Sequence, residues 1–222
     1  MGNTENNFNQ WRLKKYLDAF GQIFALNICF VIGCIPVFTI GASLTALYAM
    51  CIRIQEGEEE YVVHGFIECY KKNFKKATIS FFFMLLVGII MFSELWFIDK
   101  TEGFVSWFYT IFLALQVGAA GLMFPFVFPL LSRYENTVKN TFINSFLLAI
   151  GFLPSWIKFT VAWIGPIAIS YIYPIIFTQT WWMWLVFLFG LIAWGTSFTI
   201  RAVFRGNKKV SEEKAAEENN EE

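Results

Sequence analysis

Residues 27–52, NICFVIGCIPVFTIGASLTALYAMCI, form the segment around which the predicted fold is arranged. It is apolar enough to lie in a bilayer, but Pro36 and Gly41 interrupt it near its middle. Proline removes a backbone N–H donor and glycine frees the backbone dihedrals, so we expect the helix to break between these two residues. The apolar run starts near residue 17, and one straight helix over residues 17–52 would be about 54 Å long, whereas a bilayer core is about 30 Å thick.

Composition places the whole chain in a membrane. Of its 222 residues 57% are hydrophobic, 20% are aromatic and only 15% are charged. In a water-soluble domain roughly a quarter of the residues are charged, because charged side chains cover its surface. The net charge is zero, so the overall charge gives no argument for binding nucleic acid, and we expect none as a partner. We predict an all-α, polytopic transmembrane helical bundle with the lipid bilayer around it.

The remaining apolar runs complete this bundle. Counting them with the first stretch gives five or six membrane segments within one transmembrane domain, residues 17–205. Residues 1–16 form an amphipathic lead-in at the membrane surface. Residues 206–222 are rich in Glu and Lys and lack aromatic residues, so we expect a disordered acidic tail. The later spans are expected at residues 77–98, 104–131, 156–177 and 181–200.

Orientation follows from the basic residues, which gather in the loops on the cytoplasmic side of a membrane protein. If the links 99–103 and 178–180 face outward, every Lys and Arg other than Lys100 lies on the opposite side. The C-terminus is then cytoplasmic. Both flanks of residues 17–52 are basic as well, so we predict a hairpin or re-entrant pair, 17–35 and 37–52. One tilted, kinked span with the N-terminus outside is the alternative.

Two groups of residues are candidates for a functional site. The first belongs to the broken stretch, where polar groups could line a small cavity or could instead serve helix packing. The second is a basic and aromatic helix over residues 64–76, which could dock a partner or lie flat on anionic lipid. The cavity candidates are Asn27, Pro36, Thr39, Gly41, Ser43 and Gln116. The docking or lipid-contact candidates are Phe66, Tyr70, Lys71, Lys72, Phe74, Lys75 and Lys76.

The chain carries no recognisable catalytic motif. It has one histidine, no His-Glu-x-x-His, no Gly-x-Ser-x-Gly and no phosphate-binding loop that ends in Lys-Ser or Lys-Thr. The four cysteines show no spacing typical of metal ligands, and we interpret them as small buried hydrophobic residues. We therefore expect no enzymatic activity, no cofactor and no metal. The cysteines are Cys29, Cys34, Cys51 and Cys69.

Three stretches resemble the YesL-like proteins, a family of small bacterial membrane proteins of unassigned function. The resemblance covers about residues 10–205. This chain departs from it after Leu153-Pro154: members often carry a basic residue at the next position, whereas here that position is Ser155 and the first basic residue is Lys158. The matching residues are Asn27 with CIPVFTIGA at 34–42 and Ala46-Leu47-Tyr48; EGEE at 56–59 with Phe66 and NFKKA at 73–77; and RYEN at 133–136 with Leu153-Pro154.

The resemblance implies a location and an association. Its members lie in the bacterial plasma membrane and are typically encoded beside carbohydrate ABC importers and polysaccharide-degrading enzymes. We therefore expect an accessory or regulatory component of such an importer, with the ABC permease subunits as partners. Two alternatives remain: a small solute permease that acts by itself, and a non-catalytic scaffold or assembly protein. The family has no established site residues to transfer.

Overall fold

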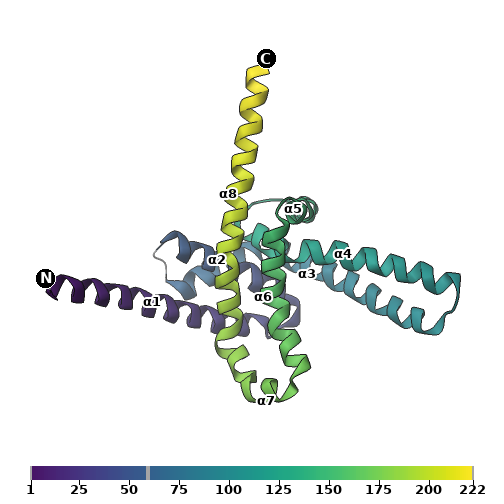
Figure 1. Cartoon of the computed structure of the whole chain (residues 1–222), viewed down its shortest axis with the longest axis horizontal. Coiled ribbons are helices and arrows are strands. Elements are labelled where there is room, and N and C mark those ends of the chain that lie inside the picture. The colour runs from purple at the N-terminus through teal and green to yellow at the C-terminus, as the bar shows by residue number, and fades with distance from the viewer. Residues whose placement is uncertain (1, 59–60, 222) are drawn as a thin grey trace.

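The computed structural model describes residues 2–58 and 61–221, with side chains in residues 18–58, 61–175, 177–184 and 186–208. Helices make up nearly all of this part of the chain, and it contains no strand. The predicted all-α fold is confirmed (Figure 1). The helices are α1 (Gly2–Cys34), α2 (Ile40–Glu56), α3 (Val62–Lys100), α4 (Phe104–Arg133), α5 (Val138–Gly151), α6 (Leu153–Ile172), α7 (Pro174–Met183) and α8 (Phe189–Glu221), with a 3-10 turn at Val37–Thr39 and a π-helical segment at Trp184–Leu188.

The segment count agrees with a multi-pass membrane protein. Five helical segments are long and apolar enough to cross a bilayer, and Asp18–Cys34 is a shorter apolar helix, so the expected five or six membrane segments are found. The five long segments are Val37–Glu56, Val62–Lys100, Phe104–Arg133, Leu153–Ile172 and Val186–Lys208.

The first apolar stretch breaks where Pro36 predicts. Helix α1 ends at Cys34 and α2 begins at Ile40, with a 3-10 turn between them. The Thr39 hydroxyl donates to the carbonyl oxygens of Gly33 (2.7 Å) and Pro36 (2.6 Å), which closes the turn. Beyond it the Ser43 side chain packs directly against Gly33, where there is no room for a Cβ. The two helices therefore pack against each other as a pair on either side of the break.

Helix α2 lies at the centre of the molecule. Every residue from Gly41 to Ile52 is buried, because α1, α3, α4 and α8 all pack around this helix. Gly41 is the closest crossing: a Cβ at this position would stand 2.5 Å from the Ala77 carbonyl oxygen and 2.8 Å from the Phe81 Cβ. Only a glycine allows α2 and α3 to approach this closely.

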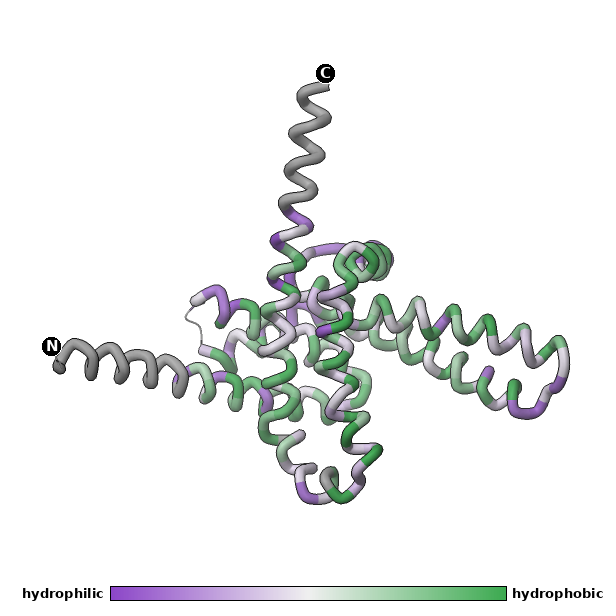
Figure 2. Tube along the Cα trace, in the orientation of Figure 1, coloured by the Kyte–Doolittle hydropathy of each residue, from purple (hydrophilic) through white to green (hydrophobic). Residues whose placement is uncertain are grey.

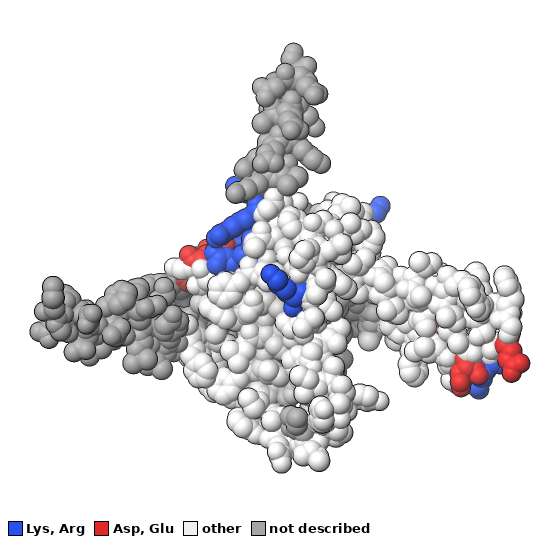
Figure 3. All heavy atoms as spheres, in the orientation of Figure 1, with Lys and Arg blue, Asp and Glu red and all other residues white. Residues whose placement is uncertain are grey.

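Two hairpins diverge from this centre. The outer parts of α3 and α4, residues 81–100 and 104–124, extend away from α2 as a two-helix hairpin that we call the α3–α4 arm, while α6, α7 and the start of α8 extend in another direction (Figure 1). Both hairpins are largely hydrophobic along their length (Figure 2). The charged side chains visible in Figure 3 gather mainly at the tip of the α3–α4 arm and near the point where the C-terminal part of α8 leaves the packed helices.

Three boundaries differ from the sequence-based expectation. The predicted surface helix and the span at 77–98 form one continuous helix, α3, because no glycine or proline separates them after Gly65. The predicted link at 178–180 lies inside α7. Helix α8 continues to Glu221, through the segment 206–222 expected to be disordered; its Ala, Glu and Lys residues are strong helix formers. Residues 2–16 belong to α1, but their predicted amphipathic face lies outside the described side chains.

Candidate functional site

Asn27 accepts a hydrogen bond from a backbone N–H that lies close to a π-helical segment. Such π-helical segments are rare and often lie at functional sites. The fully buried Asn27 Oδ1 accepts from the Gly190 N–H at 2.7 Å, just after the segment Trp184–Leu188. A Cβ on Gly190 would lie 3.0 Å from the Ile23 carbonyl oxygen. This contact therefore holds α1 tightly against α8.

The other candidates of the broken stretch serve separate contacts. Thr39 and Ser43 are buried at the turn between α1 and α2, Gly41 lies at the crossing with α3, and Pro36 is exposed. Gln116 lies apart from them in the α3–α4 arm, where its Nε2 donates to Glu94 Oε1 at 2.6 Å. These candidates do not converge on one polar cavity.

A buried tyrosine network joins three helices, and sequence reasoning missed it. Tyr48 of α2 is 2% exposed, and its hydroxyl accepts from Trp163 Nε1 of α6 at 2.8 Å and lies 3.2 Å from Thr196 Oγ1 of α8. Buried Tyr and Trp side chains usually need such polar partners. In the sequence, Tyr48 was the one phenol within the central apolar stretch, and this was the available signal.

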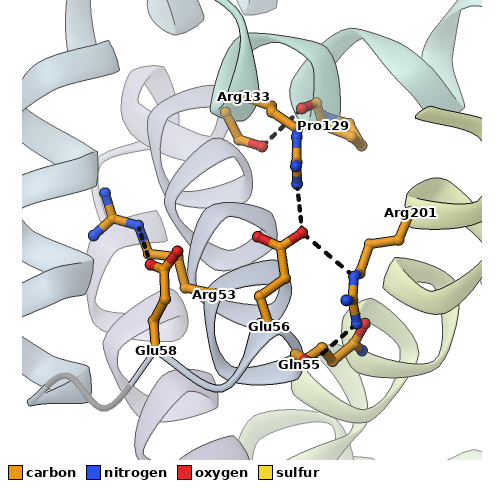
Figure 4. Close-up of polar contacts among 8 residues, drawn as sticks. Arg53, Gln55, Glu56, Glu58, Pro129, Arg133 and Arg201 are labelled. Atoms are coloured by element: carbon orange, nitrogen blue, oxygen red, sulfur yellow. Dashed lines mark hydrogen bonds and ion pairs between the residues drawn. The ribbon is translucent and has the colours of Figure 1, made fainter. Parts of the chain in front are cut away.

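An ionic cluster lies at the end of α2 and joins it to α4 and α8 (Figure 4). Glu56 Oε1 lies 2.8 Å from Arg133 Nη1 at the end of α4 and 3.6 Å from Arg201 Nε of α8. Arg201 Nη1 also donates to the Gln55 carbonyl oxygen at 3.1 Å. A glutamate at a helix C-terminus meets the negative end of the helix dipole, so the two arginines compensate an unfavourable position.

The predicted docking helix presents only part of its surface. It is the first section of α3, where Phe66 is buried, Tyr70 and Phe74 are partly buried, and all three pack against the core. Of its lysines, Lys71, Lys72 and Lys75 are exposed and Lys76 is partly buried. Lys72 Nζ lies 2.9 Å from Glu135 Oε1, and this hydrogen bond lowers the pKa of Glu135. The lysines, rather than the aromatic residues, face outward.

A large hollow of the described structure is an apolar notch between the α3–α4 arm and α6. Its volume is about 1360 Å³, and its only polar lining side chains, apart from tryptophan, are Gln116 and Thr160. At its base Pro125 cannot donate to the Gly121 carbonyl, four residues earlier, and Trp156 Nε1 donates to this oxygen instead at 2.9 Å. This bond joins α6 to α4 at the point where the two hairpins separate.

Comparison with known families gives a match to part of the chain. Residues 23–95 match the family described as a protein of unknown function, DUF624, which is the YesL-like family of bacterial membrane proteins. The match agrees with the resemblance seen in the sequence and covers about a third of the chain. No curated protein and no solved structure matches it. The family description assigns no activity, so function has to be argued from the geometry.

The family match covers the centre of the molecule and only part of the notch. It contains Asn27, the helix break and all of α2, and it ends within the α3–α4 arm. Gln116, Trp156 and Thr160 lie beyond it. Among residues 2–58 and 61–221, no three His, Cys, Asp or Glu side chains gather into a group that could hold a metal ion, and all four cysteines are free thiols.

Proposed function

We propose that this protein is an accessory or regulatory component of a membrane complex, associated with a carbohydrate ABC importer. The proposal rests on the exposed apolar surface of the α3–α4 arm. In the most apolar stretch of Val62–Lys100 only 6% of the residues are buried inside the protein, and the arm borders a wide apolar notch. A surface of this kind suits contact with another membrane segment. The importer as partner comes from the family resemblance.

The contacts of the broken stretch favour this proposal over a solute permease. A transporter built on a broken helix uses the freed backbone and nearby polar groups to bind its solute. Here Asn27 is bound to Gly190, and Thr39 is bound to the carbonyls of its own turn. Asn27 and Thr39 therefore support helix packing. A scaffold without a defined partner is the second alternative, and the same experiment separates it from an importer subunit.

We also propose that the ends of α2, α4 and α8 that carry Arg53, Arg133 and Arg201 face the cytoplasm, together with the C-terminus, in the bacterial plasma membrane. Basic residues favour the cytoplasmic side. Thr101→Cys at the tip of the arm should then react with a membrane-impermeant maleimide on intact cells. Asn207→Cys, near the end of the described side chains of α8, should react only after lysis. The opposite pattern would contradict this orientation.

Affinity purification tests the proposed association. A C-terminally tagged copy is purified from native membranes in mild detergent, and the recovered proteins are identified by mass spectrometry. We expect permease subunits of a carbohydrate ABC importer in near-equal amount, and an unrelated tagged membrane protein should recover none. Recovery of this protein alone would contradict the proposal and favour an independent permease.

The exposed lysines of α3 offer a second contact for the same complex. Lys71 and Lys75 face outward and make no ion pair with a described residue, whereas Lys72 is paired with Glu135. If the partner contacts this face, Lys71→Glu with Lys75→Glu should lower partner recovery by several fold, while the matched Lys71→Gln with Lys75→Gln lowers it less. Equal recovery with both double variants and the wild type would assign these lysines to lipid headgroups.

A further inference from the structure

We propose that the apolar notch receives a single uncharged transmembrane helix of another membrane protein, and that this helix brings a hydrogen-bond donor to the level of Gln116. The inference rests on the proposed accessory function and names the surface at which the partner binds. No charged side chain is among the described residues that line the notch, so its occupant has to be uncharged over this length.

The glycines of the notch have no packing role within this chain. A Cβ on Gly88, Gly118 or Gly121 would meet no atom within 4 Å, whereas at Gly41 and Gly190 it would meet a neighbouring helix. Glycine inside a helix is less stable than alanine, so a run of small residues at a surface needs another reason. In membranes such residues allow two helices to approach closely. The run comprises Gly118, Ala119, Ala120 and Gly121.

The polar groups beside the notch are incompletely satisfied. The Thr160 hydroxyl is buried and has no hydrogen-bond partner, although most Ser and Thr side chains of these helices, such as Thr196, donate to a carbonyl of the preceding turn. Glu94 is 6% exposed; Gln116 binds one of its carboxyl oxygens, and the other has no partner. Gln116 itself lines the notch. Only the Nε2 of the partly exposed Gln116 is bound, and its Oε1 has no partner among the described residues, so a donor on an incoming helix would bind this oxygen.

The size of the notch suits one helix. A helix is about 10–12 Å wide, so a notch of about 1360 Å³ accommodates a helical segment about 12–17 Å long, which is about 8–12 residues. This corresponds to about half of a bilayer core. We assign the notch to a partner helix, and a second copy of this chain and acyl chains are the alternatives that the experiment has to separate.

Photo-crosslinking identifies the occupant directly. Val117 and Ile164 lie on opposite walls of the notch and are 55% and 56% exposed. A benzoylphenylalanine at either position should form a crosslink to one discrete polypeptide in native membranes. The matched control is Phe198 of α8, which is 53% exposed and does not line the notch; it should form none. Crosslinks to lipid alone, or to a second copy of this chain, would overturn the proposal.

A matched pair of glycine variants tests the close approach. Gly118→Leu fills the notch wall, and Gly195→Leu adds the same side chain to α8, where a Cβ also meets no atom within 4 Å. We expect at least a tenfold loss of the copurified partner for Gly118→Leu, an unchanged amount for Gly195→Leu, and wild-type expression of both. Full recovery with Gly118→Leu would overturn this inference and leave the proposed function intact. If the wild-type protein recovers no partner, the proposed function itself fails.

Discussion

Helix α2 and the α3–α4 arm are both apolar enough to cross a membrane, but they have opposite surroundings. In the most apolar stretch of Val37–Glu56, 72% of the residues are buried inside the protein, against 6% in Val62–Lys100. Glycine has a different role in each: Gly41 lies at a crossing of helices, whereas Gly118 faces open space. In lipid both environments are apolar, so hydropathy does not distinguish the core of this protein from its outer surface.

The largest expected effect comes from adding the same side chain to both regions. Gly41→Leu places a Cβ 2.5 Å from the Ala77 carbonyl oxygen, a backbone atom that cannot move alone. We expect a loss of at least about 3 kcal/mol of stability, or failure to accumulate, because overpacking strains the helix crossing. Gly118→Leu should leave the thermal unfolding temperature in detergent within error of the wild type. Equal effects of the two variants would refute the distinction between core and arm.

The next effect concerns a buried hydrogen bond. Asn27→Leu removes the side-chain oxygen that accepts from the buried Gly190 N–H, and the loss of a buried hydrogen-bond partner costs about 1–3 kcal/mol. Its counterpart in the arm is Ser93→Ala, which removes an exposed hydroxyl bonded to its own helix and should have almost no effect. Thermal unfolding in detergent, followed by fluorescence size exclusion, measures both. A stable Asn27→Leu protein would show that α1 and α8 do not depend on this contact.

Removing one phenol oxygen gives a smaller change. Tyr48→Phe leaves Trp163 Nε1 without its acceptor, which we expect to cost about 1 kcal/mol, within the range found for hydrogen bonds in membrane proteins. Tyr109→Phe is the matched change in the arm, where the ring stacks on Phe97 at 5.9 Å and is kept by the substitution. A stability difference between these two variants supports the role of Tyr48 at the centre, and equal stability contradicts it.

The ionic cluster at the end of α2 should contribute less still. Glu56→Gln keeps the shape of the side chain and removes the charge that faces Arg133 and Arg201. Partly exposed ion pairs contribute up to about 1 kcal/mol, and salt screens them. The loss should therefore shrink in high salt, whereas Glu102→Gln at the tip of the arm should be neutral in any salt. A loss that does not depend on salt would point to hydrogen bonding rather than charge.

The smallest effect is a pH dependence outside the membrane. Lys72 lowers the pKa of Glu135, so the folded protein holds this carboxylate ionised to a lower pH than the unfolded chain does. The stabilisation is present above the ordinary pKa of glutamate and is lost as the pH falls through the lowered value. The stability difference between wild type and Glu135→Gln should vanish below that pH. A difference that persists there would exclude the ion pair as its cause.

Most local features followed from particular residues. Pro36 ended a helix as predicted, since proline has no N–H to donate. The separation of a surface helix from the span at 77–98 was not found, because a change from basic to apolar residues does not interrupt the backbone hydrogen bonds of α3. Phe66 and Tyr70 had been placed on a docking surface, but they face the core. Helical spacing shows which residues share a face and does not show what that face contacts.

Composition, segment length and proline chemistry act locally, and they were enough to predict a helical, multi-pass membrane protein with a break at Pro36. The choice of α2 as the core depends instead on how the helices pack in space. The same packing places Asn27 against Gly190, Tyr48 against Trp163 and Glu56 near Arg201. It also leaves the notch beside Gln116. These partners lie far apart in the chain, and where almost every side chain is apolar, steric fit at positions such as Gly41 selects the packing.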